Sequence, residues 1–351
     1  MASESPVKLK PEEASSLGRS KRPTPKHNFE GHEDDIWSFV FLHDNVHIVS
    51  GSWDGSMRKW DCETGLLVGE PWEGKTSIYA LALSPDGKTI ACGRSDGSVQ
   101  RWDTNGQMMG DIWMDHSGPV EGLSWSPSGV QLASGSEDGT ILIRNSESGE
   151  VEVGPIETNQ RWVCSLAYSH SGDRIASGGK NGTICIWNSY TGELLVGPIQ
   201  DLRLWVTSIV WSSDSRKLYS ASDEFACVFD SFSGAELHRF QHDDLLYSIA
   251  LLPKHSLLAC VGGLGIAQLW DIESHQSLGH PFHQEDDKDV RCVSFSQDGK
   301  YLAYSGEDKR ITLWLVKDIA PDIPVRDIDC TSDGKLIGNM KWTLVTIAIL
   351  F

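Results

Sequence analysis

The sequence has 351 residues and a formal net charge of −19, with 14 tryptophans and 34 glycines. This composition is typical of a folded chain and argues against a disordered one. Residues 1–26 carry six Lys and Arg against three Asp and Glu, so the acidic charge lies in the remainder of the chain. An acidic body repels nucleic acid and anionic membranes, so we expect neutral or basic protein partners and no direct nucleic-acid partner.

The first 23 residues form a basic segment that we expect to be disordered. Within it, Arg19-Ser20-Lys21-Arg22 is either a nuclear address or a solvated tail. The N-terminal segment has no apolar run of the signal-peptide kind, and the apolar run Trp342–Phe351 is shorter than the roughly 20 residues that span a bilayer. We therefore expect a cytoplasmic or nuclear protein that is not secreted and has no membrane span.

Seven segments of the chain end in similar tripeptides. The central aromatic or arginine residue recurs at intervals of 41 to 44 residues, a period typical of a repeat that holds four short strands. In chain order the tripeptides are Lys59-Trp60-Asp61, Arg101-Trp102-Asp103, Ile143-Arg144-Asn145, Ile186-Trp187-Asn188, Val228-Phe229-Asp230, Leu269-Trp270-Asp271 and Leu313-Trp314-Leu315.

Turn signals divide each repeat into strands. Ser84-Pro85-Asp86-Gly87 and Ser126-Pro127-Ser128-Gly129 are tight-turn sequences, and Ser296-Gln297-Asp298-Gly299 is a third. Hairpin dipeptides follow at Asp54-Gly55, Asp96-Gly97, Asp138-Gly139 and Asn181-Gly182. The stretches between the turns, such as Thr140–Ile143, are almost continuously apolar, which is typical of strands covered on both faces.

These repeats predict an all-β fold, a seven-bladed β-propeller of four-stranded antiparallel blades. A single small sheet cannot bury its two apolar faces, whereas stacked blades that close into a circle cover every face.

The tripeptides, together with Gly31-His32 some 29 residues before Asp61, resemble the WD-repeat family over roughly residues 25–315. The resemblance implies a hydrogen-bonded set in each blade, made by the His of Gly-His, a strand Ser, the turn Asp and the Trp. Repeat 1 matches it fully, repeats 2, 4 and 5 lack the His, and we expect looser blades near 5 and 6. The residues assigned to these sets are His32, Ser50, Asp54, Trp60, Asp96, Trp102, His116, Asp138, Trp187, His242, Trp270, Asp308 and Trp314.

The same resemblance implies how the ring closes. The outer strand of the last blade is expected from the segment Thr24–Glu30, pairing beside the strand that ends at Trp314. The propeller then spans residues 24–315. Residues 316–351 remain as a C-terminal extension that packs on the ring, binds a partner or is disordered.

In this family the residues that flank the first apolar residue of the inner strand, and the one before the turn Asp, face the narrow top of the ring. Trp, Tyr and Arg dominate binding hot spots, so a partner is expected here. The alternative is that several of these rings pack between blades. The candidate partner-binding residues are Asp35, Trp37, Trp53, Tyr79, Glu121, Arg161, Trp162, Arg203, Trp205, Tyr247, Asp289 and Arg291.

Catalytic and metal-binding patterns are absent from the sequence. It has no nucleophile elbow, phosphate-binding loop or zinc-protease motif, so we expect no enzyme activity, no cofactor and no metal. The eight cysteines stand singly, and Cys185, Cys227, Cys260 and Cys292 lie in apolar runs. Gly262–Gly265 occupies the hairpin slot of repeat 6 and is not followed by a helix, which disfavours a phosphate cradle.

The predicted function is a non-enzymatic scaffold or adaptor that binds a protein or peptide on its aromatic top face, as part of a multiprotein complex. One alternative is a chromatin-associated reader or chaperone of basic, histone-like tails, using Asp35, Glu121 and Asp289. Another is a ubiquitin-ligase substrate adaptor, although endings such as Trp60-Asp61-Cys62-Glu63 lack the Arg that often accompanies that role. Self-association is left open.

Overall fold

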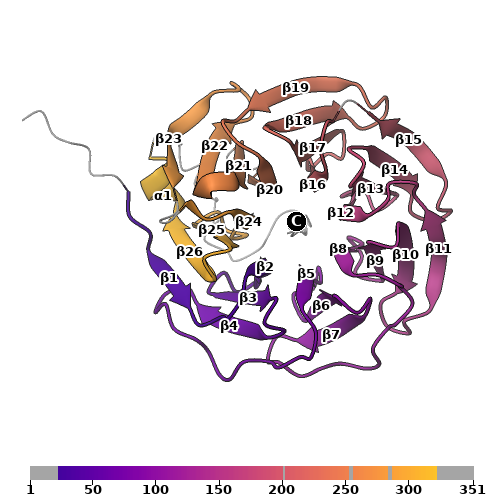
Figure 1. Ribbon diagram of the computed structural model, residues 1–351, viewed down its shortest axis with the longest axis horizontal. Helices are drawn as coiled ribbons and strands as arrows, with labels where there is room; N and C mark the ends of the chain where they lie inside the picture. The colour runs from indigo at the N-terminus through magenta and orange to yellow at the C-terminus, as the bar shows by residue number, and fades with distance from the viewer. Residues whose placement is uncertain (1–22, 201, 253–255, 284–286, 322–351) are drawn as a thin grey trace, which may run out of the picture.

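The computed structural model describes residues 23–200, 202–252, 256–283 and 287–321. Within these residues the strands form seven antiparallel sheets, arranged as blades around one central axis (Figure 1). The chain visits the blades in sequence order, and the first strand of each blade lies nearest the axis. The predicted seven-bladed propeller is confirmed.

The strands have the following bounds. Blade 1 contains β2 (Ile36–Phe41), β3 (His47–Ser52) and β4 (Met57–Asp61), and blade 2 contains β5 (Ile78–Leu83), β6 (Thr89–Arg94) and β7 (Val99–Asp103). Blade 3 contains β8 (Val120–Trp125), β9 (Gln131–Ser136), β10 (Thr140–Asn145) and β11 (Val151–Glu157). Blade 4 contains β12 (Val163–Tyr168), β13 (Arg174–Gly179), β14 (Ile184–Asn188) and β15 (Leu194–Ile199).

The remaining blades follow in the same way. Blade 5 contains β16 (Val206–Trp211), β17 (Lys217–Ser222), β18 (Phe225–Asp230) and β19 (Glu236–Gln241). Blade 6 contains β20 (Leu246–Leu252), β21 (Leu257–Gly262), the 3-10 turn η2 (Gly263–Gly265), β22 (Ile266–Asp271) and β23 (Ser277–His283). Blade 7 contains β24 (Val290–Phe295), β25 (Tyr301–Gly306), β26 (Arg310–Leu315) and the closing strand β1 (His27–Glu30).

Blades 1 and 2 differ from the four-stranded expectation, because their outer segments pair with β4 and β7 only at isolated bridges. In blade 1 the bridges join Trp60 to Leu67 and Met57 to Trp72. Between them lie Gly69, with φ +76°, and Pro71, which has no backbone N–H to donate. These residues interrupt the ladder, so the outer segment follows the blade without forming a continuous strand.

The ring closes where the sequence predicted. Strand β1 pairs antiparallel with β26, with His27 opposite Leu313 and Glu30 opposite Arg310. The backbone N–H of Lys26 also donates to the carbonyl of Leu313 at 2.7 Å. Two distant parts of the chain therefore share blade 7, with pairing that begins at His27 rather than Thr24.

The hydrophobic core lies between neighbouring blades. Every residue of β2, β8, β12, β16, β20 and β24 is buried, as expected for strands covered on both faces. One core cluster joins Phe39 and Ile48 of blade 1 to Tyr301 and Leu313 of blade 7. Hydrogen bonds also cross between blades, since the Ser38 hydroxyl accepts the backbone N–H of Leu81 at 3.0 Å.

The predicted hairpin turns are confirmed. Gly55, Gly97, Gly139 and Gly182 follow the turn Asp or Asn with φ between +73° and +85°. A side chain at these positions would be strained, because L-residues rarely adopt that backbone conformation. The tight turn after β8 likewise closes with a hydrogen bond from the Gly129 N–H to the Ser126 carbonyl at 2.8 Å.

The hydrogen-bonded set of repeat 1 is present in full. Nδ1 of His32 lies 2.8 Å from Asp54 Oδ2, and Nε2 lies 2.7 Å from the Ser50 hydroxyl. The Trp60 indole N–H donates to the same hydroxyl at 2.8 Å. Burial alone would raise the pKa of Asp54, but hydrogen bonds from His32 and from backbone N–H groups offset it and hold the pKa well below its usual range.

The other repeats keep parts of this set. In repeat 3, His116 lies 3.1 Å from Asp138 and 2.8 Å from Ser134, while Arg144 forms an ion pair with Asp115 at 2.7 Å. In repeat 6 the indole N–H of Trp270 donates to His242 at 3.2 Å, and burial lowers the pKa of His242 to about 4.

Repeat 4 lacks the His but not the network. The Trp187 indole donates to the Ser177 hydroxyl at 2.8 Å, and that hydroxyl donates to the Gln160 amide oxygen at 2.6 Å. The Gln160 amide nitrogen continues to the Thr183 carbonyl at 2.9 Å. Gln160 therefore occupies the place of the missing His in this hydrogen-bond network.

The turn acids of repeats 2 and 7 cap their own hairpins. Asp96 accepts the N–H of Ser98 at 3.0 Å, and Asp308 accepts that of Arg310 at 3.1 Å. In repeat 2 the Trp102 indole nitrogen has no hydrogen-bond partner among the described residues. Trp314 is buried in the core between blades 6 and 7.

The chain continues past β26 into a short helix, α1 (Val316–Ile319), whose Val316 and Ile319 are buried in that same core. The extension thus begins by packing on the ring. The basic stretch Arg19–Arg22 and the apolar run Trp342–Phe351 lie outside the described residues. Among the described residues, no helix has the length and apolar character needed to cross a bilayer.

Candidate protein-interaction site at the centre of the ring

Each inner strand carries a β-bulge at its second residue. In blade 1, Ile36 pairs with Ser52 and Ser38 with Gly51, so Trp37 has no partner in the ladder. Within the described residues the same shift occurs in all seven blades, at Trp37, Tyr79, Glu121, Cys164, Thr207, Tyr247 and Arg291. A bulge re-aims the extra side chain. The seven bulges place these side chains around the inner edge of the ring.

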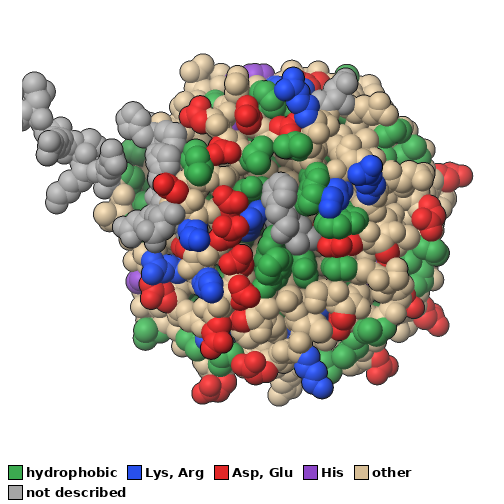
Figure 2. Space-filling model, in the orientation of Figure 1, with side chains coloured by type: hydrophobic (Ala, Val, Ile, Leu, Met, Phe, Trp, Pro, Cys, Tyr) green, Lys and Arg blue, Asp and Glu red, His purple; other side chains and the backbone are tan. Residues whose placement is uncertain are grey.

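Aromatic side chains pack together at this place. Trp37 is buried, and Trp53, Tyr79, Trp162 and Trp205 pack against it, a group that we call the ring-centre cluster. The indoles of Trp37 and Trp53 are stacked at 4.7 Å between centroids, and Tyr79 lies 5.9 Å from Trp37. On the face shown in Figure 2, hydrophobic side chains gather around the centre, with acidic and basic side chains beside them.

Arg291 joins the cluster to blade 6. Its guanidinium lies 5.2 Å from the Trp37 ring and 4.4 Å from the Tyr247 ring. It also forms ion pairs with Asp289, at 3.2 Å, and with Glu307. Burial and the nearby Asp289 raise the pKa of Tyr247 to about 12.

Acidic groups accumulate around Arg291. Burial raises the pKa of Asp35, and the neighbouring Glu307 and Asp34 add to this effect. This side of the ring centre therefore holds more carboxyl groups, from Asp34, Asp35, Asp289 and Glu307, than cations, from Arg291 and Lys309.

The other side of the ring centre holds a second acidic pair and a lysine. Glu121 is fully buried, and burial together with the neighbouring Glu137 raises its pKa well above the usual range. The Lys180 ammonium lies 3.0 Å from the Trp162 ring centroid and 4.1 Å from that of Trp205. The two indoles meet edge to face, 5.5 Å apart.

Contacts join several of the twelve predicted site residues around Trp37 and Arg291, and four of the twelve are buried. Trp37, Glu121, Tyr247 and Arg291 are each at most 5% exposed. They are held by the neighbouring blades and support the site from beneath, which corrects the expectation that they line an open rim. Arg161 and Arg203 are exposed, and the remaining six (Asp35, Trp53, Tyr79, Trp162, Trp205 and Asp289) are half-buried.

Three further residues belong to the site and were missed by sequence reasoning. Glu137, Lys180 and Glu307 each precede the turn residue of their hairpin, as Trp53 precedes Asp54. The backbone N–H of each donates to the residue two positions before the bulge, for example Lys180 to the Trp162 carbonyl at 3.1 Å. Applying the rule used for Trp53 to every repeat would have found them.

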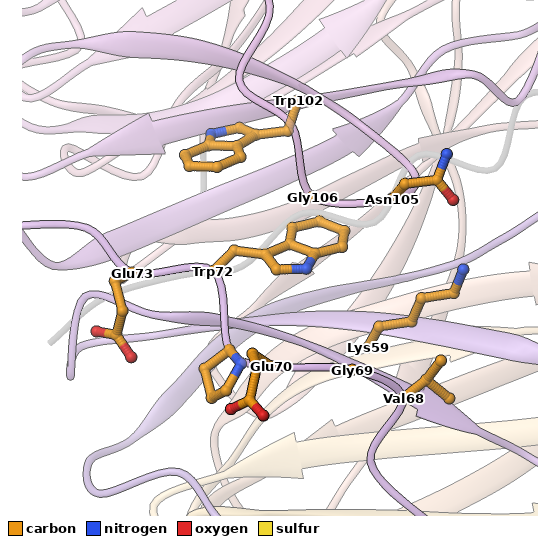
Figure 3. Close-up of a pocket in the computed structure, with 10 residues that line it drawn as sticks. Lys59, Val68, Gly69, Glu70, Trp72, Glu73, Trp102, Asn105 and Gly106 are labelled. Atoms are coloured by element: carbon orange, nitrogen blue, oxygen red, sulfur yellow. The ribbon is translucent and has the colours of Figure 1, made fainter.

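A separate cavity of about 540 Å³ lies at the outer edge of blades 1 and 2 (Figure 3). Trp72 and Trp102 line it with nearly parallel rings, 6.2 Å apart, and Lys59, Glu70 and Glu73 are its charged lining residues. This set contains no nucleophile beside a base. The cavity lies apart from the site at the ring centre.

Metal and thiol chemistry find no support in the described part of the chain. No three His, Cys, Asp or Glu side chains gather there in a way that could hold a metal ion. The seven cysteines within it are buried free thiols. Burial raises the pKa of Cys92 to about 11 and that of Cys292 to about 12, so these thiols remain protonated at neutral pH.

Comparison with known proteins agrees with this architecture. The family profile described as the IFT140 first beta-propeller matches residues 41–226, and that of the WD domain, G-beta repeat, matches residues 274–314. A chain in a crystal structure of the mitotic checkpoint complex superposes with a TM-score of 0.75 over 90% of this chain and 97% of its own. At 19% identity, that likeness concerns the fold.

A relative with detectable sequence identity is eukaryotic translation initiation factor 3 subunit I of Phaeosphaeria nodorum. It is 33% identical over 60 residues, which are 17% of this chain and 18% of that protein. This chain thus matches less than a fifth of the length of that relative.

Proposed function

This chain belongs to the WD-repeat family of β-propellers, and on that premise we propose that it is a non-enzymatic scaffold that binds a protein or peptide partner at the ring centre. The fold is consistent with an interaction scaffold. The observation that carries the proposal is the ring-centre cluster, in which aromatic side chains from several blades pack against Trp37, with the cations Arg291 and Lys180 over its rings.

The physical basis is rigid display. Each inner strand is packed between two blades, so the cluster loses little conformational freedom when a partner binds, and its contact area contributes efficiently to affinity. Trp, Tyr and Arg are the residues that carry most binding energy in protein interfaces. Arg161, Arg203 and Leu204 stand exposed beside the cluster and offer the first contacts.

The proposed setting is a multiprotein complex in the cytoplasm or nucleus. Two findings support this setting: a chain of the same fold occurs in the mitotic checkpoint complex, and the matched relative is named as a subunit of an initiation factor. The acidic ring centre favours the alternative of a basic-tail reader over that of a ubiquitin-ligase adaptor, because carboxyl groups outnumber cations around Glu121 and Asp35.

The test is quantitative affinity purification with mass spectrometry, followed by affinity measurement with the partner recovered. The site variant is Arg161→Ala/Arg203→Ala/Leu204→Ala, which changes exposed side chains only. The matched control is Tyr190→Ala/Leu237→Ala, since these residues are 65% and 51% exposed but lie toward the outer edges of blades 4 and 5.

We expect the site variant to weaken partner binding by about tenfold or more, as removal of interface residues of this kind does. The control should bind as wild type does, and both variants should melt as wild type does. Equal binding by all three proteins would contradict the proposal, as would selective loss in the control.

A further inference from the structure

We propose that Trp162 and Trp205 form a cage for a lysine ammonium group, that Lys180 fills this cage in the free protein, and that a lysine of the bound partner displaces it. The inference rests on the proposed function, because it names the chemistry by which the ring centre recognises its partner. It concerns the inner ends of blades 4 and 5, beside Glu121 of blade 3.

The geometry of the two indoles is that of a cation site. Their planes meet at 64°, and the Lys180 ammonium lies within 4.1 Å of both ring centroids. A cation over an indole face is attracted by the negative charge of the ring, and the attraction strengthens as water is excluded. Lys180 demonstrates that an ammonium group fits between these rings.

The shape favours ammonium over guanidinium. A planar guanidinium stacks best on a parallel ring face, whereas two rings set edge to face leave an angular space for a compact ion. The preferred side chain is therefore lysine rather than arginine.

Two acidic side chains, Glu121 and Glu137, lie close to Lys180. Glu121 is fully buried, and neither of its carboxylate oxygens makes a well-formed hydrogen bond within the described residues. Burial and Glu137 raise the pKa of Glu121 even though Lys180 opposes the shift. The acidic pair beside the two indoles thus favours a cation in the cage over an anion, whether the cation comes from Lys180 or from a partner.

Lys180 is held weakly enough to be displaced. Its ammonium contacts the two indole rings and is attracted to Glu121 from beyond ion-pair distance within the described part of the chain. Its four-carbon stem has many rotamers, so release to solvent regains side-chain entropy. A lysine on a bound peptide, already fixed by other contacts, can take its place.

The experiment uses the full chain and small probes, so that it does not depend on knowing the partner. n-Butylammonium is titrated into protein carrying ¹⁵N-tryptophan, and the indole N–H signals of Trp162 and Trp205 are followed by NMR. Assignment uses Trp162→Phe and Trp205→Phe. n-Butylguanidinium and the neutral n-pentanol serve as probes that match its size.

The informative variant is Lys180→Met, which keeps the stem and removes the charge, with Lys180→Gln as a second version. Lys88→Met is the matched control, because the Lys88 side chain is 81% exposed and belongs to a distant turn. We expect n-butylammonium to bind Lys180→Met about tenfold more tightly than wild type or Lys88→Met, the order expected for one freed cation–π site. The other two probes should gain less.

Equal binding of n-butylammonium to wild type and to both Lys180 variants would overturn the inference. So would n-pentanol binding as tightly as n-butylammonium, since that describes an apolar pocket. Neither result touches the scaffold proposal, which the Arg161/Arg203/Leu204 variant decides with the natural partner. If the Arg161/Arg203/Leu204 variant binds the partner as wild type does, while n-butylammonium binds as predicted, the cation cage stands and the proposed partner surface is wrong.

Discussion

Equivalent serine hydroxyls make different hydrogen bonds in blades 1 and 5. The Ser50 hydroxyl sits between an imidazole and an indole, whereas the equivalent Ser220 hydroxyl of blade 5 has no partner among the described residues. The two serines occupy the same register position in β3 and β17. They form a natural pair for measuring what the network contributes.

We expect Ser50→Ala to lower the free energy of unfolding by about 1–3 kcal/mol, because it leaves buried polar groups of His32 and Trp60 unpaired. Ser220→Ala should change it by less than about 0.5 kcal/mol, because no bond is lost. Equilibrium urea unfolding measures both. Equal losses in the two variants would show that the network is not what holds blade 1.

The raised pKa of Glu121 makes stability depend on pH. The unfolded carboxyl ionises near pH 4.5, while the folded one, buried and facing Glu137, Cys164, Lys180 and Tyr79, retains its proton to higher pH. Stability is therefore lost as pH rises from about 4.5 through the folded pKa.

Glu121→Gln imitates the protonated form and should remove this dependence. We predict that the variant is more stable than wild type at pH 8, by about 1–3 kcal/mol, and nearly equal to it at pH 4.5. Thermal unfolding at the two pH values tests this. A variant that is less stable at pH 8 would mean that the ionised carboxylate is compensated.

At the scale of the element, ion pairs between side chains hold the closing strand β1 in addition to its backbone pairing with β26. The Glu63 carboxylate of blade 1 lies 2.8 Å from Lys26 and 2.7 Å from Lys300, and it accepts the Tyr301 hydroxyl at 2.7 Å. These hydrogen bonds lower the pKa of Glu63 to about 2. One side chain therefore ties blade 1 to both chain segments of blade 7.

Glu63→Gln should lower the melting temperature at pH 7, and the difference from wild type should shrink as pH falls from about 4.5 toward 2. The sign follows because a carboxyl with a lowered folded pKa stabilises only above its unfolded pKa and loses that contribution on protonation. Glu147→Gln, an exposed position without an ion pair among the described residues, is the control. A difference in melting temperature that does not change with pH would contradict the stabilising role of the ionised Glu63 carboxylate.

Blade 5 is expected to open more readily than blade 1. Phe229 stands where blade 1 has Trp60 and brings no indole N–H, and Ser220 is unpaired within the described residues. Backbone amides of β18 should exchange hydrogen at least about tenfold faster than those of β4, which corresponds to a local stability difference of about 1.4 kcal/mol. Equal protection would show that packing between blades outweighs the side-chain network.

Periodic features of this fold could be predicted from the sequence, and features of pairing could not. The Asp-Gly turns and the seven blades follow from local spacing, and the closing strand follows from the family resemblance. The bulges at Trp37 and its six counterparts depend on the register between two strands, which no local signal specifies. The burial of Trp37 and Arg291 depends on side chains from other blades. The replacement of the His by Gln160 depends on the Gln160 amide reaching the Ser177 hydroxyl of the network.

At the scale of the whole molecule, the ring converts seven similar repeats into one asymmetric surface. Equivalent bulge positions carry an indole, a carboxyl, a thiol, a hydroxyl and a guanidinium, so the backbone repeats while the chemistry does not. Closure through β1 holds these positions in a fixed arrangement. A surface of this kind distinguishes partners by side-chain pattern on a stiff backbone.

The most direct measurement is site-specific photo-crosslinking in cells, with benzoylphenylalanine placed at Arg161, Leu204, Tyr190 or Leu237. Our account predicts that one partner is crosslinked from positions 161 and 204 and that positions 190 and 237 give no adduct with it. Crosslinks to that partner from 190 and 237 alone would contradict the central claim, because they would place the interface on the outer edge of the blades.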